Sequence, residues 1–232
     1  MNTPMNQKDK FIKEDGADKV DEAHFKSLIR CLMYLTSTRL DILFQFMHCS
    51  SELHLKAAKR VVRYIKGTAN YGVKYDKVQD FKLSSFSDSD WAGSLDDMKS
   101  TSGYCFSMGS SVLSWCSKKQ EVVAQSVAKA KFVAATVAIN QAIWLRNIPS
   151  KFRTELFQSH MIACFTGRPN TLIEVQENGD VSLVYCKTKD QTAYMFMKSF
   201  SLNKFEFMRK KLGVCDLQDG NVTTRKKTLM IA

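Results

Sequence analysis

Residues 81–120 read FKLSSFSDSDWAGSLDDMKSTSGYCFSMGSSVLSWCSKKQ, and this stretch decides the fold. Hydrophobic and polar residues alternate over 81–88, which predicts a strand that ends at Asp88. The runs 103–108 and 112–117 are separated by Gly-Ser-Ser and predict a β-hairpin. Three consecutive strands of this kind predict a sheet, and the sheet needs a covering layer on at least one face.

Helical patterns flank this stretch on both sides. A long amphipathic helix is predicted after Ser126, where it packs on the hairpin sheet. Upstream, apolar spacing predicts a helix over 22–35 and another over 51–66, with Ser51 as N-cap and Gly67 just after the last turn. The apolar positions of the long helix are Ala130, Val133, Ala134, Val137, Ala138, Ile143, Trp144 and Leu145.

The composition is that of a folded, basic protein. The chain has 232 residues, 44% of them hydrophobic, and its 34 Lys and Arg exceed its 23 Asp and Glu. A net charge of +11 favours a polyanionic partner such as nucleic acid. The seven cysteines include no C-x-x-C pair, so they suggest neither a disulfide framework nor a zinc site. No apolar run approaches the ~18 residues that span a bilayer, and we expect a soluble intracellular protein, cytoplasmic or nuclear, without membrane contact.

Basic side chains recur along one side of the helix predicted over 51–66. No Asp or Glu occurs between Lys56 and Tyr75, so these cations repel one another, and a phosphate backbone would relieve that repulsion. The alternative is a solvated basic face without a ligand. Lys99 and the pair Lys118-Lys119 are further candidates for phosphate contact. The candidate cations of the helix are Lys56, Lys59, Arg60, Arg63 and Lys66.

Three short motifs carry a family resemblance: S-D-S-D-W-A-G at 87–93, K-S-T-S-G-Y at 99–104 and S-W-C-S-K-K-Q at 114–120. They closely resemble the ribonuclease H domain of copia-type LTR retrotransposon polyproteins. The resemblance implies an α+β fold, with a mixed β-sheet and flanking helices behind a helical connection segment like the end of a reverse transcriptase. It covers roughly 3–148 and 178–215. The implied parts are a flexible arm (1–20), the connection segment (21–79), a ribonuclease H-like domain (80–215) and a tail (216–232).

Ribonucleases H cleave the RNA strand of RNA/DNA hybrids with two Mg²⁺ ions about 4 Å apart, which four carboxylates hold. Asp88 matches the first carboxylate, whereas Lys131 stands at the second position and Tyr194 at the fourth. The third has no clear counterpart, and the nearest candidate pair, Cys164-Phe165, places Phe where Asp is needed. The resemblance therefore implies Mg²⁺ in the family, but we expect none to be bound here.

The expected partner is an RNA/DNA hybrid or another polyanion rather than a small-molecule substrate. Three possibilities remain open: an inactive nuclease with residual nucleic-acid binding, a transposon remnant without function, and an active Mg²⁺-dependent ribonuclease. We expect the first. Asp96 and Asp97 lie in a loop between strands, and their spacing does not return them to Asp88.

The last third of the chain gives weaker signals. Residues 181–186 predict a late strand and 204–212 a last helix. The resemblance places a further central strand within 149–176, but polar residues there interrupt any apolar run longer than about five. We therefore expect a missing central strand and marginal stability. Trp91 and Trp115 are expected to be core anchors rather than base-stacking platforms.

Overall fold

The computed structural model describes residues 2–6, 11–42, 49–75, 83–146, 161–165 and 181–218. Helices and strands alternate irregularly along these residues, so the fold class is α+β, as predicted. The elements in chain order are α1 (Glu22–Leu35), α2 (Glu52–Gly67), β1 (Tyr71–Val73), β2 (Leu83–Ser89), β3 (Thr101–Met108), β4 (Ser111–Lys119), α3 (Val127–Arg146), β5 (Met161–Phe165), β6 (Val181–Tyr185), η4 (Thr192–Phe196), α5 (Leu202–Lys211) and β7 (Val214–Asp216).

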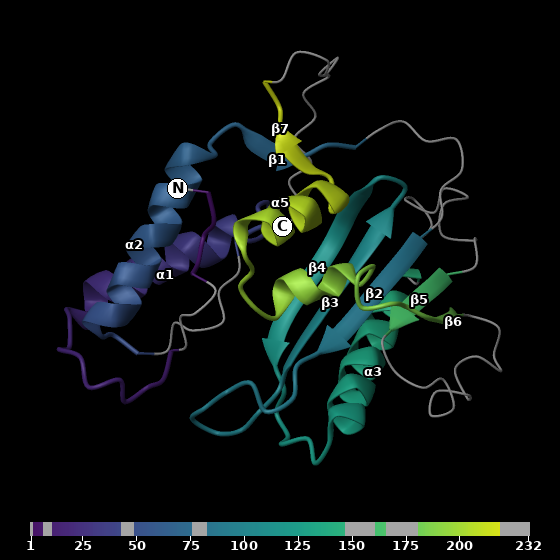
Figure 1. Cartoon of the computed structure of the whole chain (residues 1–232), viewed down its shortest axis with the longest axis horizontal. Coiled ribbons are helices and arrows are strands. Elements are labelled where there is room, and N and C mark those ends of the chain that lie inside the picture. The colour runs from purple at the N-terminus through teal and green to yellow at the C-terminus, as the bar shows by residue number, and fades with distance from the viewer. Residues whose placement is uncertain are drawn as a thin grey trace.

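A five-stranded mixed sheet forms the centre of the molecule, with the order β4-β3-β2-β5-β6 (Figure 1). The β2, β3 and β4 strands are antiparallel neighbours, which confirms the predicted hairpin. On the other side of β2, the strands β5 and β6 run parallel to it. The first strand of the sheet in the sequence, β2, is therefore its middle strand, and Asp88 lies near the end of this strand, opposite Gly103 of β3.

The strand β5 corrects the expectation of a missing central strand. Residues 161–165 pair in parallel with β2 and with β6, and Phe165 lies opposite Ser87. A central strand needs only a short apolar run, here M-I-A-C-F, because its two neighbours supply the backbone hydrogen bonds. Marginal stability was predicted because this strand was expected to be absent, and that premise is wrong. The rest of 149–176 lies outside the described residues.

One face of the sheet is covered by α3. Ala138, Ala142 and Leu145 of the helix form a hydrophobic cluster with Tyr104 and Phe106 of β3. The small alanine side chains let the helix approach the strands closely, which explains why this helix and this sheet face fit together. The predicted packing of the long helix on the hairpin is confirmed.

The opposite face of the sheet packs against helices from both ends of the chain. Cys105 of β3 and Val112 of β4 share one hydrophobic cluster with Phe25 of α1, Val61 of α2 and Phe205 of α5. The cluster therefore combines residues of the predicted connection segment (21–79) with residues of the predicted ribonuclease H-like domain (80–215). The short strands β1 and β7 pair antiparallel and join the end of the α2 region to the end of the described chain. Figure 1 shows α1 and α2 together at one side of the sheet, in purple and blue.

Capping residues set the starts of the first two helices. Asp21 accepts hydrogen bonds from the backbone N–H of Ala23 (2.9 Å) and His24 (3.2 Å) at the start of α1. Ser51 accepts from the N–H of His54 (3.3 Å), which confirms it as the N-cap of α2. The N-terminal segment wraps over this cap, because Asp15 lies 2.5 Å from the Ser51 hydroxyl and 3.2 Å from the His54 ring.

A buried ionic network joins the first two helices to the last one. The Arg39 guanidinium binds both oxygens of Asp41, at 2.8 and 2.9 Å, and also Thr68. The Tyr64 hydroxyl donates to the same carboxylate at 2.5 Å and accepts from Arg209 of α5 at 3.3 Å. Asp41 is only 1% exposed and Tyr64 is fully buried. Burial and the Asp41 charge raise the pKa of Tyr64 well above its usual value, so its hydroxyl stays protonated.

Candidate functional site

The candidate site lies at the end of β2, where Asp88 is 2% exposed. Asp88 lies opposite Gly103 of β3. A side chain at Gly103 would come within 2.9 Å of the Ala193 carbonyl, so glycine is required for η4 to cross the sheet here. This close approach brings the η4 segment with Tyr194 to the same end of the sheet as Asp88.

The ammonium of Lys131 lies 3.6 Å from the Asp88 carboxylate. Lys131 is in the first turns of α3 and its side chain is 24% exposed, against 2% for Asp88. The family resemblance aligns Asp88 with the first metal-binding carboxylate and Lys131 with the second. The structure brings these two side chains together. The result is an ion pair within the chain between the two residues that the resemblance aligns with metal-binding carboxylates.

Gln120, which sequence reasoning missed, positions this ion pair. The nitrogen of its buried side-chain amide lies within hydrogen-bond distance of the hydroxyls of Ser89 in β2 (3.2 Å) and Ser102 in β3 (2.9 Å) and of the carbonyl of Ala130 (2.9 Å), which share its two N–H groups. It therefore ties the residue before Lys131 to the end of β2. In the sequence, Gln120 is recognisable only as a polar residue shortly after a predicted strand. Such residues are too common to identify a functional position.

The strand β5 ends at Phe165, which lies opposite Ser87 in the backbone register. Asp88 is the next residue along β2, and among the described residues the pairing of β2 with β5 ends before it. The Cys164-Phe165 pair is the nearest candidate for the third carboxylate position of the family, and that assignment stays a prediction.

Tyr194 of η4, which the family resemblance aligns with the fourth carboxylate, is half-buried. Gln191, fully buried, holds this segment to β2 by donating to the Ser87 carbonyl at 3.0 Å and accepting from Ala193 N–H at 3.1 Å. The Tyr194 ring is flanked by two lysines: Lys198, which donates to its hydroxyl at 2.8 Å, and Lys204. Sequence reasoning did not select either lysine.

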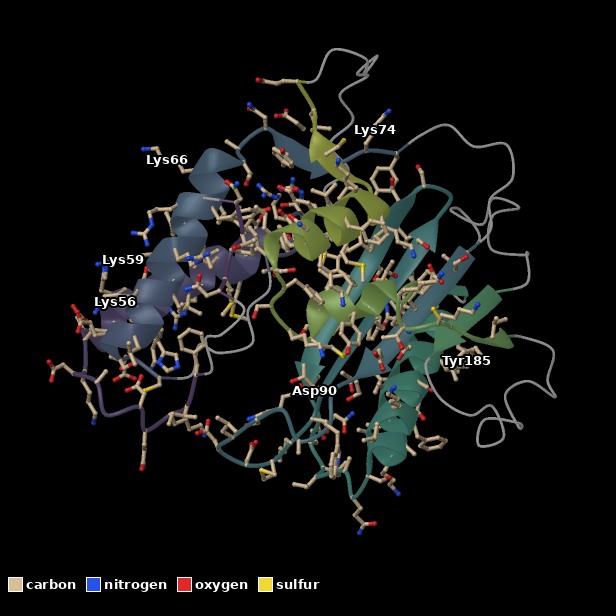
Figure 2. The ribbon with its side chains drawn as sticks, in the orientation of Figure 1. Lys56, Lys59, Lys66, Lys74, Asp90 and Tyr185 are labelled. Atoms are coloured by element: carbon tan, nitrogen blue, oxygen red, sulfur yellow. The ribbon has the colours of Figure 1, made fainter. Side chains whose placement is uncertain are left out.

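Asp90 is a second acidic group at this end of the sheet (Figure 2). Its carboxylate accepts a 2.5 Å hydrogen bond from the backbone N–H of Thr101. Burial raises the pKa of Asp90 above its ordinary value, and the Thr101 hydrogen bond and the Lys198 charge offset part of this effect. Ionised Asp90 is thus disfavoured by its surroundings.

This pKa shift predicts how stability depends on pH. A carboxyl whose pKa is raised by folding favours the folded state at low pH, and this contribution is lost as the pH rises through the folded-state pKa. Replacing Asp90→Asn keeps the acceptor for Thr101 and removes the charge. We expect the variant to melt at a higher temperature than the wild type at pH 7, with the gap closing toward pH 4. Thermal melts by circular dichroism check this, with the exposed Asp18→Asn as control; equal melting temperatures at pH 7 would contradict it.

The basic face of α2 is smaller than predicted. Arg60 is half-buried and donates to the Thr3 hydroxyl at 3.0 Å, so it belongs to the contact with the N-terminal segment. Lys56 pairs with Glu52 at 3.2 Å, although both are exposed. Lys59, Arg63 and Lys66 are exposed, and within the described parts of the chain none has a carboxylate at ion-pair distance. Lys59 and Lys66 point away from the body of the molecule in Figure 2.

Of the other three lysines predicted to contact phosphate, two already form ion pairs with acidic side chains. Lys118 pairs with Glu121 at 3.0 Å, and Lys119 with Asp97 at 2.9 Å. Hydrogen bonds from Ser94 and Lys119 hold the pKa of Asp97 well below its usual range, so it stays ionised. Lys99 is half-exposed in the same loop region. These three lysines are weaker candidates than the exposed cations of α2.

The two tryptophans differ in their environments. Trp115 packs against the cluster that includes α1 and α2, and its ring N–H donates to the Thr36 carbonyl at 3.0 Å, as expected of a core anchor. Trp91 is 52% exposed and donates to the Ala124 carbonyl at 3.0 Å, so its prediction as a core anchor is wrong. The strand ends before Trp91, and the loop turns its ring toward solvent.

None of the helices in the described residues is long and apolar enough to cross a membrane. Likewise, the described side chains contain no group of three His, Cys, Asp or Glu residues arranged to hold a metal ion.

Three curated proteins illustrate the similarity of this chain to known sequences. It is 31% identical to the retrovirus-related Pol polyprotein from transposon RE1 of Arabidopsis thaliana, over 91% of this chain and 16% of that protein. It is 27% identical to the Pol polyprotein from transposon TNT 1-94 of Nicotiana tabacum, over 88% of this chain and 17% of that protein. It is 38% identical to secreted RxLR effector protein 161 of Plasmopara viticola, over 52% of this chain and 90% of that protein.

The chain thus spans about a sixth of the length of the polyproteins that it matches, 16% for transposon RE1 and 17% for TNT 1-94. No family model matches the sequence, and no solved structure matches the fold.

Proposed function

We propose that this chain, which is homologous to the Pol polyproteins of copia-type retrotransposons, is a ribonuclease H-like part of such a polyprotein that binds RNA/DNA hybrids without cleaving them. By descent its substrate is the RNA strand of a hybrid formed during reverse transcription. Its present activity is binding alone.

The order of the strands supports the ribonuclease H-like assignment. The motif resemblance implies three antiparallel strands, a helix, and then two more strands beside the first. The sheet order β4-β3-β2-β5-β6, with α3 after the hairpin, agrees with that arrangement. The agreement is informative because β5, which follows β4 and α3 in the sequence, pairs with β2 and not with β4.

The ion pair between Lys131 and Asp88 carries the proposal that catalysis is absent. Two Mg²⁺ ions need several hard oxygen ligands that converge on them. Here the Asp88 carboxylate has an ammonium at 3.6 Å. The family resemblance aligns Tyr194 with the fourth carboxylate, and the nearest candidate for the third is Phe165. A fixed positive charge beside Asp88 repels dications, so the residues present do not fit the metal pair.

Binding is proposed to use the exposed face of α2 formed by Lys59, Arg63 and Lys66. These residues follow i, i+4, i+7 spacing, which places them on one side of the helix. When such cations neutralise phosphates, the counterions condensed on the nucleic acid are released, and this release drives affinity. The net charge of +11 acts in the same direction over a longer range.

A salt titration tests this binding face. The triple variant Lys59→Gln, Arg63→Gln and Lys66→Gln keeps helix propensity, since all three residue types favour helices similarly. We expect the slope of log K against log salt to fall by about two to three units, measured by fluorescence anisotropy with a labelled RNA/DNA hybrid in EDTA. Because phosphate contacts carry no sequence information, sequence preference should not change.

The matched control removes three exposed charges elsewhere, with Lys13→Gln, Lys19→Gln and Lys26→Gln. It should change the slope far less than the α2 variant. If both variants give the same slope, the face of α2 is only a solvated surface. If the wild type does not bind a hybrid even at low salt, the proposed function itself fails.

A further inference from the structure

Two lysines converge on a pair of aromatic rings next to the candidate site. The ring centroids of Tyr194 and Phe200 are 5.9 Å apart. The Lys198 ammonium is 4.1 Å from the Tyr194 centroid, and the Lys204 ammonium is 5.2 Å from Tyr194 and 5.0 Å from Phe200. Both lysines are exposed to solvent, so the cluster presents two positive charges at the surface.

The rings hold these charges in place. Lys198 also donates to the Tyr194 hydroxyl at 2.8 Å, which restricts a side chain that is otherwise among the most flexible. Attraction between an ammonium and the face of an aromatic ring adds to this restriction. A ligand that binds both lysines therefore has less conformational entropy to overcome than it would with two freely moving side chains.

The cluster has an excess of positive charge. In the part of the chain that the structure describes, neither Lys198 nor Lys204 has a carboxylate at ion-pair distance. Asp88, the buried acid of the site, already has the Lys131 ammonium at 3.6 Å. Asp90 is near enough for the Lys198 charge to act on it, which places the cluster at the same end of the sheet. Two ammonium groups around one ring repel each other, and a bound anion would remove that repulsion.

We infer that Lys198 and Lys204, positioned by the rings of Tyr194 and Phe200, form a binding site for a backbone phosphate of the nucleic acid. The inference rests on the proposed function and deepens it, because it places the nucleic acid at the end of β2 as well as on α2. Two fixed ammonium groups neutralise the phosphate directly, so this contact needs no metal ion.

The test compares two variants that each remove two exposed charges. One is Lys198→Gln with Lys204→Gln, and the control is Lys13→Gln with Lys19→Gln. Binding of a labelled RNA/DNA hybrid is measured by fluorescence anisotropy over a salt series in EDTA. Because the two lysines share one phosphate, we expect the cluster variant to lose about one unit of salt slope and on the order of tenfold in low-salt affinity, with little change in the control. Adding Mg²⁺ should not restore the loss.

The ring is tested separately from the charges. Tyr194→Leu removes the aromatic face but keeps both lysines, and we expect it to weaken hybrid binding several-fold. Tyr194→Phe keeps the face and loses only the hydroxyl, so it should bind more tightly than Tyr194→Leu. Circular dichroism confirms that each variant is folded before it is titrated. Equal binding by the two Tyr194 variants would show that the ring does not position the lysines and would overturn that part of the inference.

The outcomes separate this inference from the proposed function. If the wild type binds a hybrid and the α2 variant weakens binding, but the cluster variant equals its control, the inference fails and the proposed function stands. If inorganic phosphate alone binds the cluster as tightly as the hybrid does, as seen by competition, the site is one for small anions and the inference is overturned. If the wild type binds no nucleic acid, both fail.

Discussion

Purified protein incubated with a labelled RNA/DNA hybrid and Mg²⁺ or Mn²⁺ is expected to release no RNA fragments above background. An active ribonuclease H treated in parallel serves as the positive control. Hydrolytic enzymes accelerate their reactions by at least about 10⁶-fold, and in a two-metal site this acceleration depends on the metal ions. With Lys131 at 3.6 Å from Asp88, we expect that acceleration to be lost in full.

Partial restoration of the site should not recover cleavage. The double variant Lys131→Glu and Tyr194→Asp supplies carboxylates at two of the positions that the resemblance implies, but the third Asp of the family has no counterpart in this chain. We expect this variant to remain inactive. The result that would contradict the prediction is cleavage by the wild type that the substitution Asp88→Ala abolishes, because only a working metal site at Asp88 would produce it.

Among the substitutions considered, the one that disrupts the buried network around Asp41 should lower the stability of the protein most. Asp41→Asn is expected to lower the free energy of unfolding by about 3–5 kcal/mol, the usual cost of removing one partner from a buried ion pair. The cost arises because Arg39, which is 8% exposed, keeps its charge after its carboxylate partner is removed. Asn offers one oxygen where Asp41 offers two, so the Tyr64 hydroxyl and the two Arg39 donors cannot all keep an acceptor. Chemical denaturation monitored by circular dichroism measures the change.

Two comparisons make the stability result interpretable. Asp190→Asn removes an exposed carboxylate whose pairing with Lys211 is solvent-accessible, and we expect it to change stability by less than about 1 kcal/mol. Tyr64→Phe removes one hydroxyl from the network but leaves the Arg39–Asp41 pair, so its cost should be smaller than that of Asp41→Asn. If Asp41→Asn costs no more than the exposed control, the network does not stabilise the packing of α1 and α2 on α5.

Local sequence pattern was sufficient to predict much of the fold. Alternating residues before Asp88, the hairpin around Gly109, the helix over 22–35 and the Ser51 cap all depend on neighbours within a few positions. Periodicity and capping record such local preferences directly. The helix α2 extends one residue farther than predicted, to Gly67, which is the usual uncertainty at a helix end.

The short strand β5 shows where local pattern fails. Five apolar residues are too few to distinguish a strand from any other buried segment. The pairing of Ser87 with Phe165 joins residues that are far apart in the sequence, and only the assembled sheet determines it. The same holds for Arg60, whose contact with Thr3 depends on the path of the N-terminal segment.

The sequence by itself determined which residue types stand at the positions of the site: Asp88, Lys131 and Tyr194 were identified from motifs alone. The tertiary structure decided which charges meet, because the Lys131 ammonium reaches Asp88 only when α3 packs on the sheet, and Lys198 and Lys204 meet at one ring only when η4 and α5 fold together. Electrostatic energy depends on distance and burial. Neither quantity can be read from the order of residues, so the chemistry of the site follows from the fold.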